Sequence, residues 1–376
     1  MVYQFIELST DIYGSGMDED FMKALIVKPP KLDSVKLVDV AKPIPSKHEV
    51  LLETLCVGID GTDREINKGI YGSPPDGDDF LVLGHEALAR INAVGSSVKD
   101  FSPGDLVVPT VRRPCRENCL NCRNGEVSLC LTGNYYEHGI YKLHGFASEY
   151  ALCNSNFLVK IADELEKVAV LLEPLSIAEK AISQITKIQE RMIWETKRAL
   201  VLGAGPLGLL VAMLLRLRNF EVYCLATQPK DSLKADIINH INGSYINAVE
   251  TPLRTLSLKF DLVVEATGNV GVAIESLPLL GVNGVFCFLG VYREKEACQN
   301  YGKVLTGMVL GNRLMFGSVS SDKIHFRAGI RDLYAIQRRY GSVMERLITE
   351  KFSVDDFKKA FLSGQTKIKA ILLFQS

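Results

Sequence analysis

The chain has 376 residues, of which 47% are hydrophobic and 23% are charged, and its formal net charge is −1 at pH 7. This composition is typical of a soluble globular protein that is long enough for two domains with their own cores. The balanced charge argues against docking on nucleic acid or on an anionic membrane, and no apolar run reaches the roughly 18 residues that cross a bilayer. The N-terminus lacks the pattern of a secretory signal, so we expect a cytoplasmic protein.

The residue pattern predicts an N-terminal extension followed by two domains. Residues 1–21 carry five acidic side chains and no Lys or Arg, and the run MKALIVKPP from Met22 predicts the first strand. Residues 22–175 contain short β runs broken by Gly, Pro and Asp, which predict a mostly β domain. Residues 176–316 alternate apolar strands with amphipathic helices, as in a parallel sheet covered on both faces. Residues 317–376 end in the strand KAILLF, and we expect them to return to the first domain.

Metal-capable side chains stand on predicted loops of the first domain. Asp60 lies in the motif GIDGTD, His85 and Glu86 lie in GHEAL, and Glu173 lies in LLEPL. Taken singly, such an aspartate is more often a turn residue, and a His–Glu pair is more often a capped or salt-bridged turn. A metal-binding interpretation therefore depends on the order of these motifs relative to those that follow.

Four of the nine cysteines are crowded together, and the other five are scattered. The four are Cys115, Cys119, Cys122 and Cys130, spaced C-x3-C-x2-C-x7-C. Four thiolates at this spacing predict a tetrahedral Zn²⁺ site that is closed to substrate and stabilises a loop with little apolar material. An iron–sulfur cluster is the alternative.

A glycine-rich turn opens the predicted second domain. Gly203, Gly205 and Gly208 form a G-x-G-x-x-G arrangement between an apolar strand and a helix. In that context glycines allow the backbone to approach a pyrophosphate, and the helix N-terminus offers free N–H groups to the phosphates. The motif predicts a bound dinucleotide.

The next strand, EVYCLA, ends at Ala226 without the acidic residue that bonds the ribose of NAD. Thr227, Gln228, Pro229 and Lys230 follow instead, so hydrogen-bond donors and a positive charge replace a carboxylate that would repel a 2′-phosphate. We expect a preference for NADP or use of both cofactors. The preference is expected to be modest, because no Arg is present.

The order of GHE, the four-cysteine segment, EPL and GAGPLG resembles that of zinc-containing medium-chain alcohol dehydrogenases. Within them, the strings FLVLGHEAL, EHG and LLEPL resemble archaeal glucose 1-dehydrogenases. The resemblance covers nearly the whole chain from Met22. It implies an α/β fold with a GroES-like, mostly β catalytic domain and a Rossmann domain with a doubly wound parallel sheet. It also implies two zinc ions per subunit, NADP or NAD, and a homo-oligomer, either a tetramer or a dimer.

The resemblance also implies roles for individual residues. It implies a proton relay at Thr62 and catalytic zinc ligands at Asp60, His85, Glu86 and Glu173. Contacts with the sugar are implied at Thr62, Glu86, Glu137, Glu173 and Ser320. Contacts with the cofactor are implied at Gly203, Ala204, Gly205, Pro206, Leu207, Gly208, Thr227, Gln228, Pro229, Leu289, Gly290, Val291, Ser318, Val319, Ser320 and, near the pyrophosphate, Lys369.

The sequence departs from the family pattern at several positions. Asp60 stands where most members of the wider family have Cys, and a minority of glucose dehydrogenases have Asp. We expect this harder ligand to give a more Lewis-acidic but more weakly bound zinc. Three residues separate Cys115 from Cys119 where two are usual, so Cys115 is the structural ligand that the spacing supports least. Val111, Ile177 and Leu310 lie where some relatives place polar sugar contacts, which leaves the sugar preference open.

The predicted reaction is zinc-assisted hydride transfer from C1 of D-glucose to NADP or NAD, with D-galactose and other aldoses as further substrates. The product is the aldonolactone, which would enter an Entner–Doudoroff-type degradation. Glu86, Glu137 and Glu173 offer more hydrogen-bond acceptors than a small aliphatic alcohol needs. The alternatives are a polyol or secondary-alcohol dehydrogenase of the same superfamily and a non-catalytic, dinucleotide-binding redox sensor.

Overall fold

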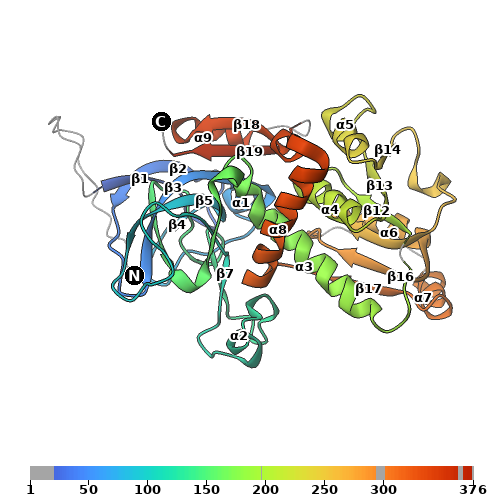
Figure 1. Cartoon of the computed structure of the whole chain (residues 1–376), viewed down its shortest axis with the longest axis horizontal. Coiled ribbons are helices and arrows are strands. Elements are labelled where there is room, and N and C mark those ends of the chain that lie inside the picture. The colour runs from blue at the N-terminus through green and yellow to red at the C-terminus, as the bar shows by residue number, and fades with distance from the viewer. Residues whose placement is uncertain (1–20, 196, 294–300, 363–366, 375–376) are drawn as a thin grey trace. The chain divides into compact units, whose positions relative to one another are not determined.

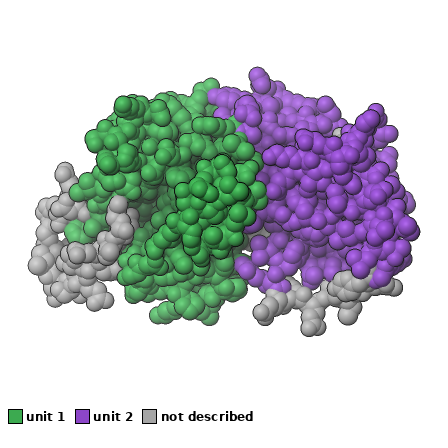
Figure 2. Space-filling view, turned by 90° about the horizontal axis from the view of Figure 1, so that it is seen from below, with its two compact units in different colours: residues 1–173, 321–327, 348–376 green, residues 174–320, 328–347 purple. Residues whose placement is uncertain are grey.

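The computed structural model describes residues 21–195, 197–293, 301–362 and 367–374. The chain divides into two compact units, which Figure 2 colours separately. Unit 1 consists of residues 1–173, 321–327 and 348–376, and unit 2 of residues 174–320 and 328–347. The predicted extension, residues 1–21, lies outside the described residues except for Phe21, where the first strand begins.

Unit 1 is built mainly from β-strands. Its largest sheet has seven strands in the order β11-β6-β5-β3-β19-β18, with β10 also paired to β3, and the smaller sheets are β2-β1-β4 and β7-β8-β9. The strands are β1 (Phe21–Val27), β2 (Lys36–Ala41), β3 (Glu49–Ile59), β4 (Leu81–Val82), β5 (Glu86–Val94), β6 (Leu106–Pro109), β7 (Arg112–Arg113), β8 (Tyr136–His138), β9 (Lys142–Leu143), β10 (Tyr150–Asn154), β11 (Leu158–Lys160), β18 (Ile348–Ser353) and β19 (Lys369–Leu373). Central strand β3 is apolar along most of its length because both of its faces are buried.

Three short helices belong to unit 1: α1 (Gly61–Asn67), α2 (Leu120–Arg123) and α9 (Phe357–Phe361). Helix α2 stands on a loop that projects from the rest of this unit (Figure 1). The loop buries few apolar side chains besides its cysteines and Val127, because its leucines are exposed, so its own packing stabilises it weakly.

Unit 2 contains a parallel six-stranded sheet in the order β14-β13-β12-β15-β16-β17. If the strands are numbered in chain order from β12, they run 3-2-1-4-5-6 across the sheet, which is the strand order of dinucleotide-binding sheets. The strands are β12 (Arg198–Leu202), β13 (Glu221–Ala226), β14 (Ser244–Asn247), β15 (Phe260–Glu265), β16 (Leu280–Phe288) and β17 (Leu314–Gly317). The remaining helices are α3 (Leu172–Gln189), α4 (Pro206–Leu217), α5 (Leu233–His240), α6 (Val270–Ser276), α7 (Tyr301–Leu310) and α8 (Lys323–Tyr340). The mostly β unit and this doubly wound sheet confirm the predicted α/β class of fold.

None of the helices in the described ranges is long and apolar enough to cross a membrane. The C-terminal segment returns to unit 1 as predicted through residues 321–327 and 348–376, but not over its whole length. Residues 317–376 do not belong to the first domain as a whole, because residues 317–320 and 328–347 are part of unit 2. The reason is the packing of α8, where Leu333 and Ile336 are fully buried and Asp332 pairs with Arg218 beyond the end of α4. The first division falls at Glu173, two residues before the expected boundary.

Candidate active site

Three neighbouring strands of unit 1 bring the candidate metal ligands to one edge of the sheet. Strand β3 lies between β5 and β19, with Gly58 opposite Glu86 and Ile59 opposite Ala370. Asp60 follows the last residue of β3, and His85 precedes the first residue of β5. Residues that are far apart in the sequence therefore meet where these strands begin or end.

Asp60 serves both as a helix cap and as a metal-capable group. Its Oδ1 accepts hydrogen bonds from the backbone N–H groups of Thr62 at 2.7 Å and Asp63 at 3.2 Å, which caps α1. Its Oδ2 lies 3.7 Å from His85 Nε2 and accepts a hydrogen bond from Thr62 Oγ1 at 3.2 Å. Burial works to raise the pKa of Asp60, but His85 and Lys369 outweigh it and hold that pKa well below its usual range. The carboxylate is therefore ionised and directed toward His85.

Asp60, His85 and Glu86 each offer one ligand atom, and these atoms lie within 4.8 Å of one another. Glu173 is buried outside that set but interacts electrostatically with all three. Burial, reinforced by Glu86 and Asp60, raises the pKa of Glu173 to about 8. The carboxylates of Asp60, Glu86 and Glu173 thus lie close together, and a bound divalent cation would offset their negative charge. The residues present fit a metal such as zinc.

Asp63 is a member of this site that the sequence interpretation did not include. Its side chain is fully buried, its Oδ2 accepts a hydrogen bond from the backbone N–H of Asp60 at 3.0 Å, and its Oδ1 lies 3.8 Å from His85 Nδ1. Neither Asp63 Oδ1 nor His85 Nδ1 has a hydrogen-bond partner within the described chain. A carboxylate behind a histidine commonly orients the imidazole so that the other nitrogen faces a metal. The position of Asp63 in a capping box, three residues after Asp60, is the local signal for it.

The placement of Lys369 corrects one prediction. We expected this residue near the pyrophosphate, but its side chain is buried in unit 1 and its ammonium donates to Glu86 Oε1 at 2.7 Å and also to Glu86 Oε2. Strand β19, which begins at Lys369, pairs with β3, and β3 pairs with β5. Gly58 leaves the space, since a Cβ there would lie 2.1 Å from Glu86 Oε2. Lys369 therefore belongs to the carboxylate cluster.

Glu137 lies on β8, beside the His85 loop. A Cβ added at Gly139 would lie 2.6 Å from the Gly84 carbonyl oxygen, so the two backbones are in close contact. The Glu137 carboxylate is buried, its Oε1 accepts a hydrogen bond from Arg112 Nε at 2.9 Å, and the same oxygen is ion-paired with Arg112 Nη2 at 2.8 Å. This arrangement holds one end of Glu137 in place. Contact with a sugar stays a prediction for this residue.

The four clustered cysteines come together as a possible metal site. Cys115, Cys119, Cys122 and Cys130 offer sulfur atoms within 4.8 Å of one another. Cys115, which the spacing supported least, is buried and accepts a hydrogen bond from the backbone N–H of Cys119 at 3.4 Å. Backbone N–H groups lower the pKa of Cys119 to about 6, which favours the thiolate that binds a metal. The geometry fits a closed, structural Cys₄ site.

The glycine turn of unit 2 is shaped for close approach of a ligand. Gly203 has a φ of +103°, and a Cβ at Gly208 would lie 2.0 Å from the Gly203 carbonyl oxygen. Helix α4 begins at Pro206, directly after Gly205, which has no side chain to cap it. The first N–H groups of the helix are left for an anion. Ala204 and Leu207 lie within the same turn.

Two adjacent strand ends carry the predicted nicotinamide contacts. Leu289, Gly290 and Val291 follow β16, and residues 318–320 follow β17, which pairs with it. The Ser318 hydroxyl is buried and finds no hydrogen-bond partner among the residues that the structure describes. Such an orphaned hydroxyl fits a site for a cofactor. Lys180 donates to the Val319 carbonyl at 2.8 Å.

Glu265, which the sequence interpretation also missed, lies beneath these loops. Its carboxylate is fully buried and accepts hydrogen bonds from the Thr267 backbone N–H at 2.6 Å and from the Tyr292 hydroxyl. A Cβ at Gly290 would lie 2.6 Å from Glu265 Oε2. Glu265 therefore holds the ends of β15 and β16 together.

The residues expected to recognise the adenosine end follow β13. Thr227, Gln228 and Pro229 come directly after Ala226, and the Gln228 carbonyl accepts a hydrogen bond from the Tyr245 hydroxyl at 2.8 Å. Lys230 pairs with Glu250 at 2.7 Å, and both side chains are more than half exposed. The positive charge expected to attract a 2′-phosphate is therefore partly offset.

Ser320 belongs to unit 2, whereas the other predicted sugar contacts belong to unit 1.

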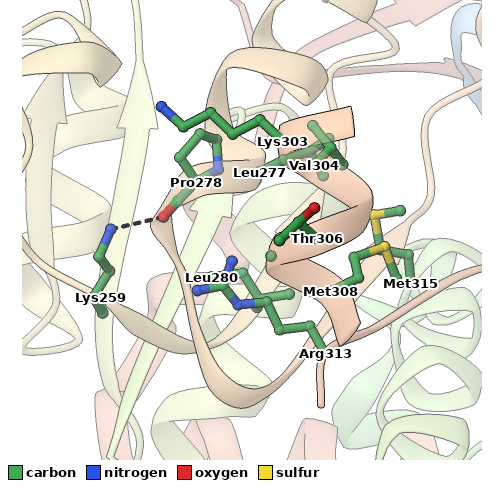
Figure 3. Close-up of a pocket in the computed structure, with 11 residues that line it drawn as sticks. Lys259, Leu277, Pro278, Leu280, Lys303, Val304, Thr306, Met308, Arg313 and Met315 are labelled. Carbon is green, nitrogen blue, oxygen red and sulfur yellow. Dashed lines mark hydrogen bonds between the residues drawn. The ribbon is translucent and has the colours of Figure 1, made fainter. Parts of the chain in front are cut away.

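A cavity of about 580 Å³ in unit 2 lies beside α7 and the start of β16 (Figure 3). Apolar side chains such as Leu277 and Met308 line it, and Lys259 donates to the Pro278 carbonyl at its edge. None of the described residues that line this cavity is a predicted site residue.

Comparison with known proteins places these features in a family. Residues 46–163 match the family described as "Alcohol dehydrogenase GroES-like domain", and residues 166–374 match "Glucose dehydrogenase C-terminus". Glucose 1-dehydrogenase 1 of Caldivirga maquilingensis is 44% identical over 352 residues, which cover 93% of this chain and 98% of that protein. Glucose 1-dehydrogenase of Methanocella arvoryzae is 41% identical over 357 residues, which cover 93% and 99%.

A solved structure gives the same result for the fold. Haloferax mediterranei glucose dehydrogenase, in complex with NADP, Zn and gluconolactone, has a TM-score of 0.87 and 32% sequence identity to this chain. The match covers 94% of this chain and 100% of that one. Both family matches and these relatives confirm the resemblance and show that the chain belongs to the glucose dehydrogenase family, within the alcohol dehydrogenases that have a GroES-like domain.

Proposed function

We propose that this protein oxidises D-glucose at C1 to gluconolactone, with zinc at the Asp60–His85–Glu86 cluster and NADP as the preferred hydride acceptor. The observation that carries the proposal is this cluster, with Glu137 on the strand beside it. The relatives named glucose 1-dehydrogenase and the Haloferax complex with NADP, Zn and gluconolactone support it. D-galactose and other aldoses are proposed as further substrates.

When bound, zinc lowers the pKa of a coordinated hydroxyl, and oxidised nicotinamide accepts the hydride that leaves C1. The chain supplies orientation and a path for the proton. Asp60 and His85 would hold the metal, Asp63 orients the His85 imidazole from behind, and Glu86 is held by Lys369. The Thr62 hydroxyl, 3.2 Å from Asp60 Oδ2, is the group that carries the proton of the C1 hydroxyl away.

Sugar recognition is proposed to depend on carboxylates, because each oxygen can accept hydrogen bonds from adjacent hydroxyl groups. Glu137 is fixed by Arg112, so it is oriented before a sugar binds. Glu173 and Ser320 are the further proposed contacts. The lactone product opens to an aldonic acid, which an Entner–Doudoroff-type degradation would consume.

The cofactor preference is proposed to favour NADP modestly. Gln228 and Lys230 follow β13 where an acidic residue would repel a 2′-phosphate, but Glu250 offsets the charge of Lys230. The predicted cofactor contacts at the glycine turn and at the ends of β16 and β17 remain proposed roles. A second zinc at the four cysteines is proposed to stabilise the projecting loop of α2.

We also propose a homo-oligomer, a dimer or a tetramer, without nucleic acid or membrane partners. Leu305, Val309 and Leu310 on α7 are 60%, 75% and 78% exposed, and such an apolar surface is suited to a second copy of the chain. Light scattering of the purified protein would give the oligomeric state directly.

The proposed function is tested with a panel of aldoses, polyols and secondary alcohols, each with NAD and NADP, on protein whose zinc content is measured. We expect glucose with NADP to give the highest kcat/KM. A polyol dehydrogenase would prefer sorbitol or a secondary alcohol, and a redox sensor would bind NADP without turning over any of them.

The variant Glu137→Gln sharpens this test, because it keeps the shape of the side chain and removes its charge. It should lower kcat/KM for glucose by about one to two orders of magnitude and leave that for a simple alcohol nearly unchanged.

A further inference from the structure

Ser128 lies at a junction of buried hydrogen bonds in unit 1. It sits in the 3₁₀ turn Val127–Leu129, between Cys122 and Cys130 of the projecting loop. Its backbone carbonyl accepts a hydrogen bond from Arg112 Nη1 at 3.2 Å. Its backbone N–H donates to Asp322 Oδ1 at 2.8 Å, and its hydroxyl donates to Asp322 Oδ2 at 2.6 Å. One small residue thus uses all of its polar groups to contact two distant segments.

The first arm of the junction leads to Glu137. Arg112 stands opposite Glu137 in the pairing of β7 with β8, and it bonds the Glu137 carboxylate through Nε and Nη2 while Nη1 reaches Ser128. The guanidinium carbon of Arg112 lies 3.7 Å from the centroid of the Tyr135 ring, a cation–π contact that helps to hold the guanidinium group. Because the guanidinium is planar and rigid, its position at Ser128 fixes its position at Glu137.

The second arm leads to the segment before α8. Asp322 precedes the first residue of α8, its backbone N–H donates to His325 Nδ1 at 3.0 Å, and its carbonyl accepts from the backbone N–H of His325 at 2.8 Å. Ser320, a proposed sugar contact with a φ of +60°, is two residues away along the chain. Arg112, Ser128 and Asp322 are each at most 6% exposed, so water competes little for these bonds.

We infer that Ser128 is a positioning residue for sugar binding, which holds Glu137 through Arg112 and holds the segment that follows Ser320 through Asp322. The inference rests on the proposed function, because it takes Glu137 and Ser320 as sugar contacts. It gives the four-cysteine loop a role besides its own folding, since that loop presents Ser128 to Arg112 and Asp322. Ser128 itself touches no reacting atom.

The test uses Ser128→Ala, Asp322→Asn and their double variant, with Ser148→Ala as the matched control. Ser148 is also a buried serine of unit 1, and its hydroxyl donates to the Tyr150 carbonyl at 2.8 Å, away from the junction. Each junction variant should raise KM for glucose about three- to tenfold, with kcat within about twofold and KM for NADP unchanged. The double variant should be no worse than the more affected single variant, because both remove the same hydrogen bond.

Hydrogen exchange gives a readout that does not depend on activity. Ser128→Ala removes the hydroxyl's hydrogen bond to Asp322 but keeps the backbone carbonyl that accepts from Arg112, so it should speed amide exchange mainly in residues 322–326. Ser148→Ala should leave residues 136–138 and 322–326 unchanged. If KM for glucose rises equally in Ser148→Ala, or does not change in Ser128→Ala while the wild type oxidises glucose, the inference is wrong. If the wild type does not oxidise glucose at all, the proposed function is wrong. The exchange data then still report whether the junction holds the two segments.

Discussion

The ammonium of Lys369 donates hydrogen bonds to both carboxylate oxygens of Glu86, and both side chains are buried. A buried ion pair contributes little net stability when it is intact, but removal of one partner leaves an uncompensated charge. In this site the charge left behind would belong to a proposed zinc ligand. Lys369 therefore links the stability of the zinc-free protein to the binding of the metal.

The variant Lys369→Met tests this link. Zinc-free Lys369→Met should melt roughly 5 to 15 °C below the zinc-free wild type, because the buried Glu86 carboxyl group loses its hydrogen-bonding partner. Added zinc should recover much of the difference. Differential scanning calorimetry with and without zinc measures both effects. Lys23→Met, which removes an exposed ion pair with Asp355, is the control and should change the unfolding free energy by less than about 1 kcal/mol in either state. Equal losses in the two variants would contradict the account.

Asp60→Cys should have two opposite effects. A thiolate donates more charge to zinc than a carboxylate does, so chelator competition at neutral pH should show tighter zinc retention. The same change removes the cap of α1, so the zinc-free protein should lose about 1 kcal/mol of unfolding free energy. Asp60→Asn separates the effects, because its amide oxygen can still cap the helix but binds zinc poorly. Weaker zinc retention in Asp60→Cys would show that the carboxylate is not the weaker ligand.

Glu179 in α3 predicts a pH dependence of stability. Burial and the neighbouring Asp332 carboxylate raise its pKa from 4.5 to about 8, although Arg218 opposes the shift. Because the folded state binds this proton more tightly than the unfolded state, the stability contributed by Glu179 is present below about pH 4.5 and is lost as pH rises toward 8. In Glu179→Gln the side chain does not ionise, so this loss of stability with rising pH does not occur. The variant should gain stability relative to the wild type between pH 5 and 8, by at most about 5 kcal/mol. A difference in unfolding free energy that does not vary with pH would refute the assignment.

Glu250→Gln should increase the preference for NADP. Glu250 competes with a 2′-phosphate for Lys230, and its removal frees that charge. Because both side chains are more than half exposed, the ratio of kcat/KM for NADP to that for NAD should rise only about threefold. Lys230→Met is the counterpart and should lower the ratio. If the ratio does not respond to either change, Lys230 does not contact the 2′-phosphate.

Most of what the sequence could predict came from motifs within one short segment of the chain. The glycine turn at Gly203 and the four cysteines consist of residues within one short segment, so their spacing alone indicates their chemistry. Asp60 lies on one segment and the adjacent residues His85 and Glu86 lie on another, and only the order of these segments along the chain connected them before the strand pairing of β3 with β5 was known.

The residues that were missed or misplaced depend on long-range packing. Lys369 and Glu86 are 283 positions apart, and their contact requires that β19 joins the sheet beside β3. Ser128 and Asp322 are 194 positions apart, and neither is a position that a sequence motif specifies. The placement of residues 328–347 in unit 2 depends on which apolar side chains of α8 find partners, and helical periodicity does not identify those partners.

The proposed glucose oxidation depends on zinc at Asp60, His85 and Glu86. The most direct measurement is the rate of NADP reduction with D-glucose, before and after the zinc is removed by a chelator and after zinc is restored. We predict that activity falls at least a hundredfold on removal and returns with zinc, and that glucose exceeds sorbitol by a similar factor. A zinc-loaded protein that reduces NADP with sorbitol but not with glucose, or that keeps its glucose activity without zinc, would contradict the account.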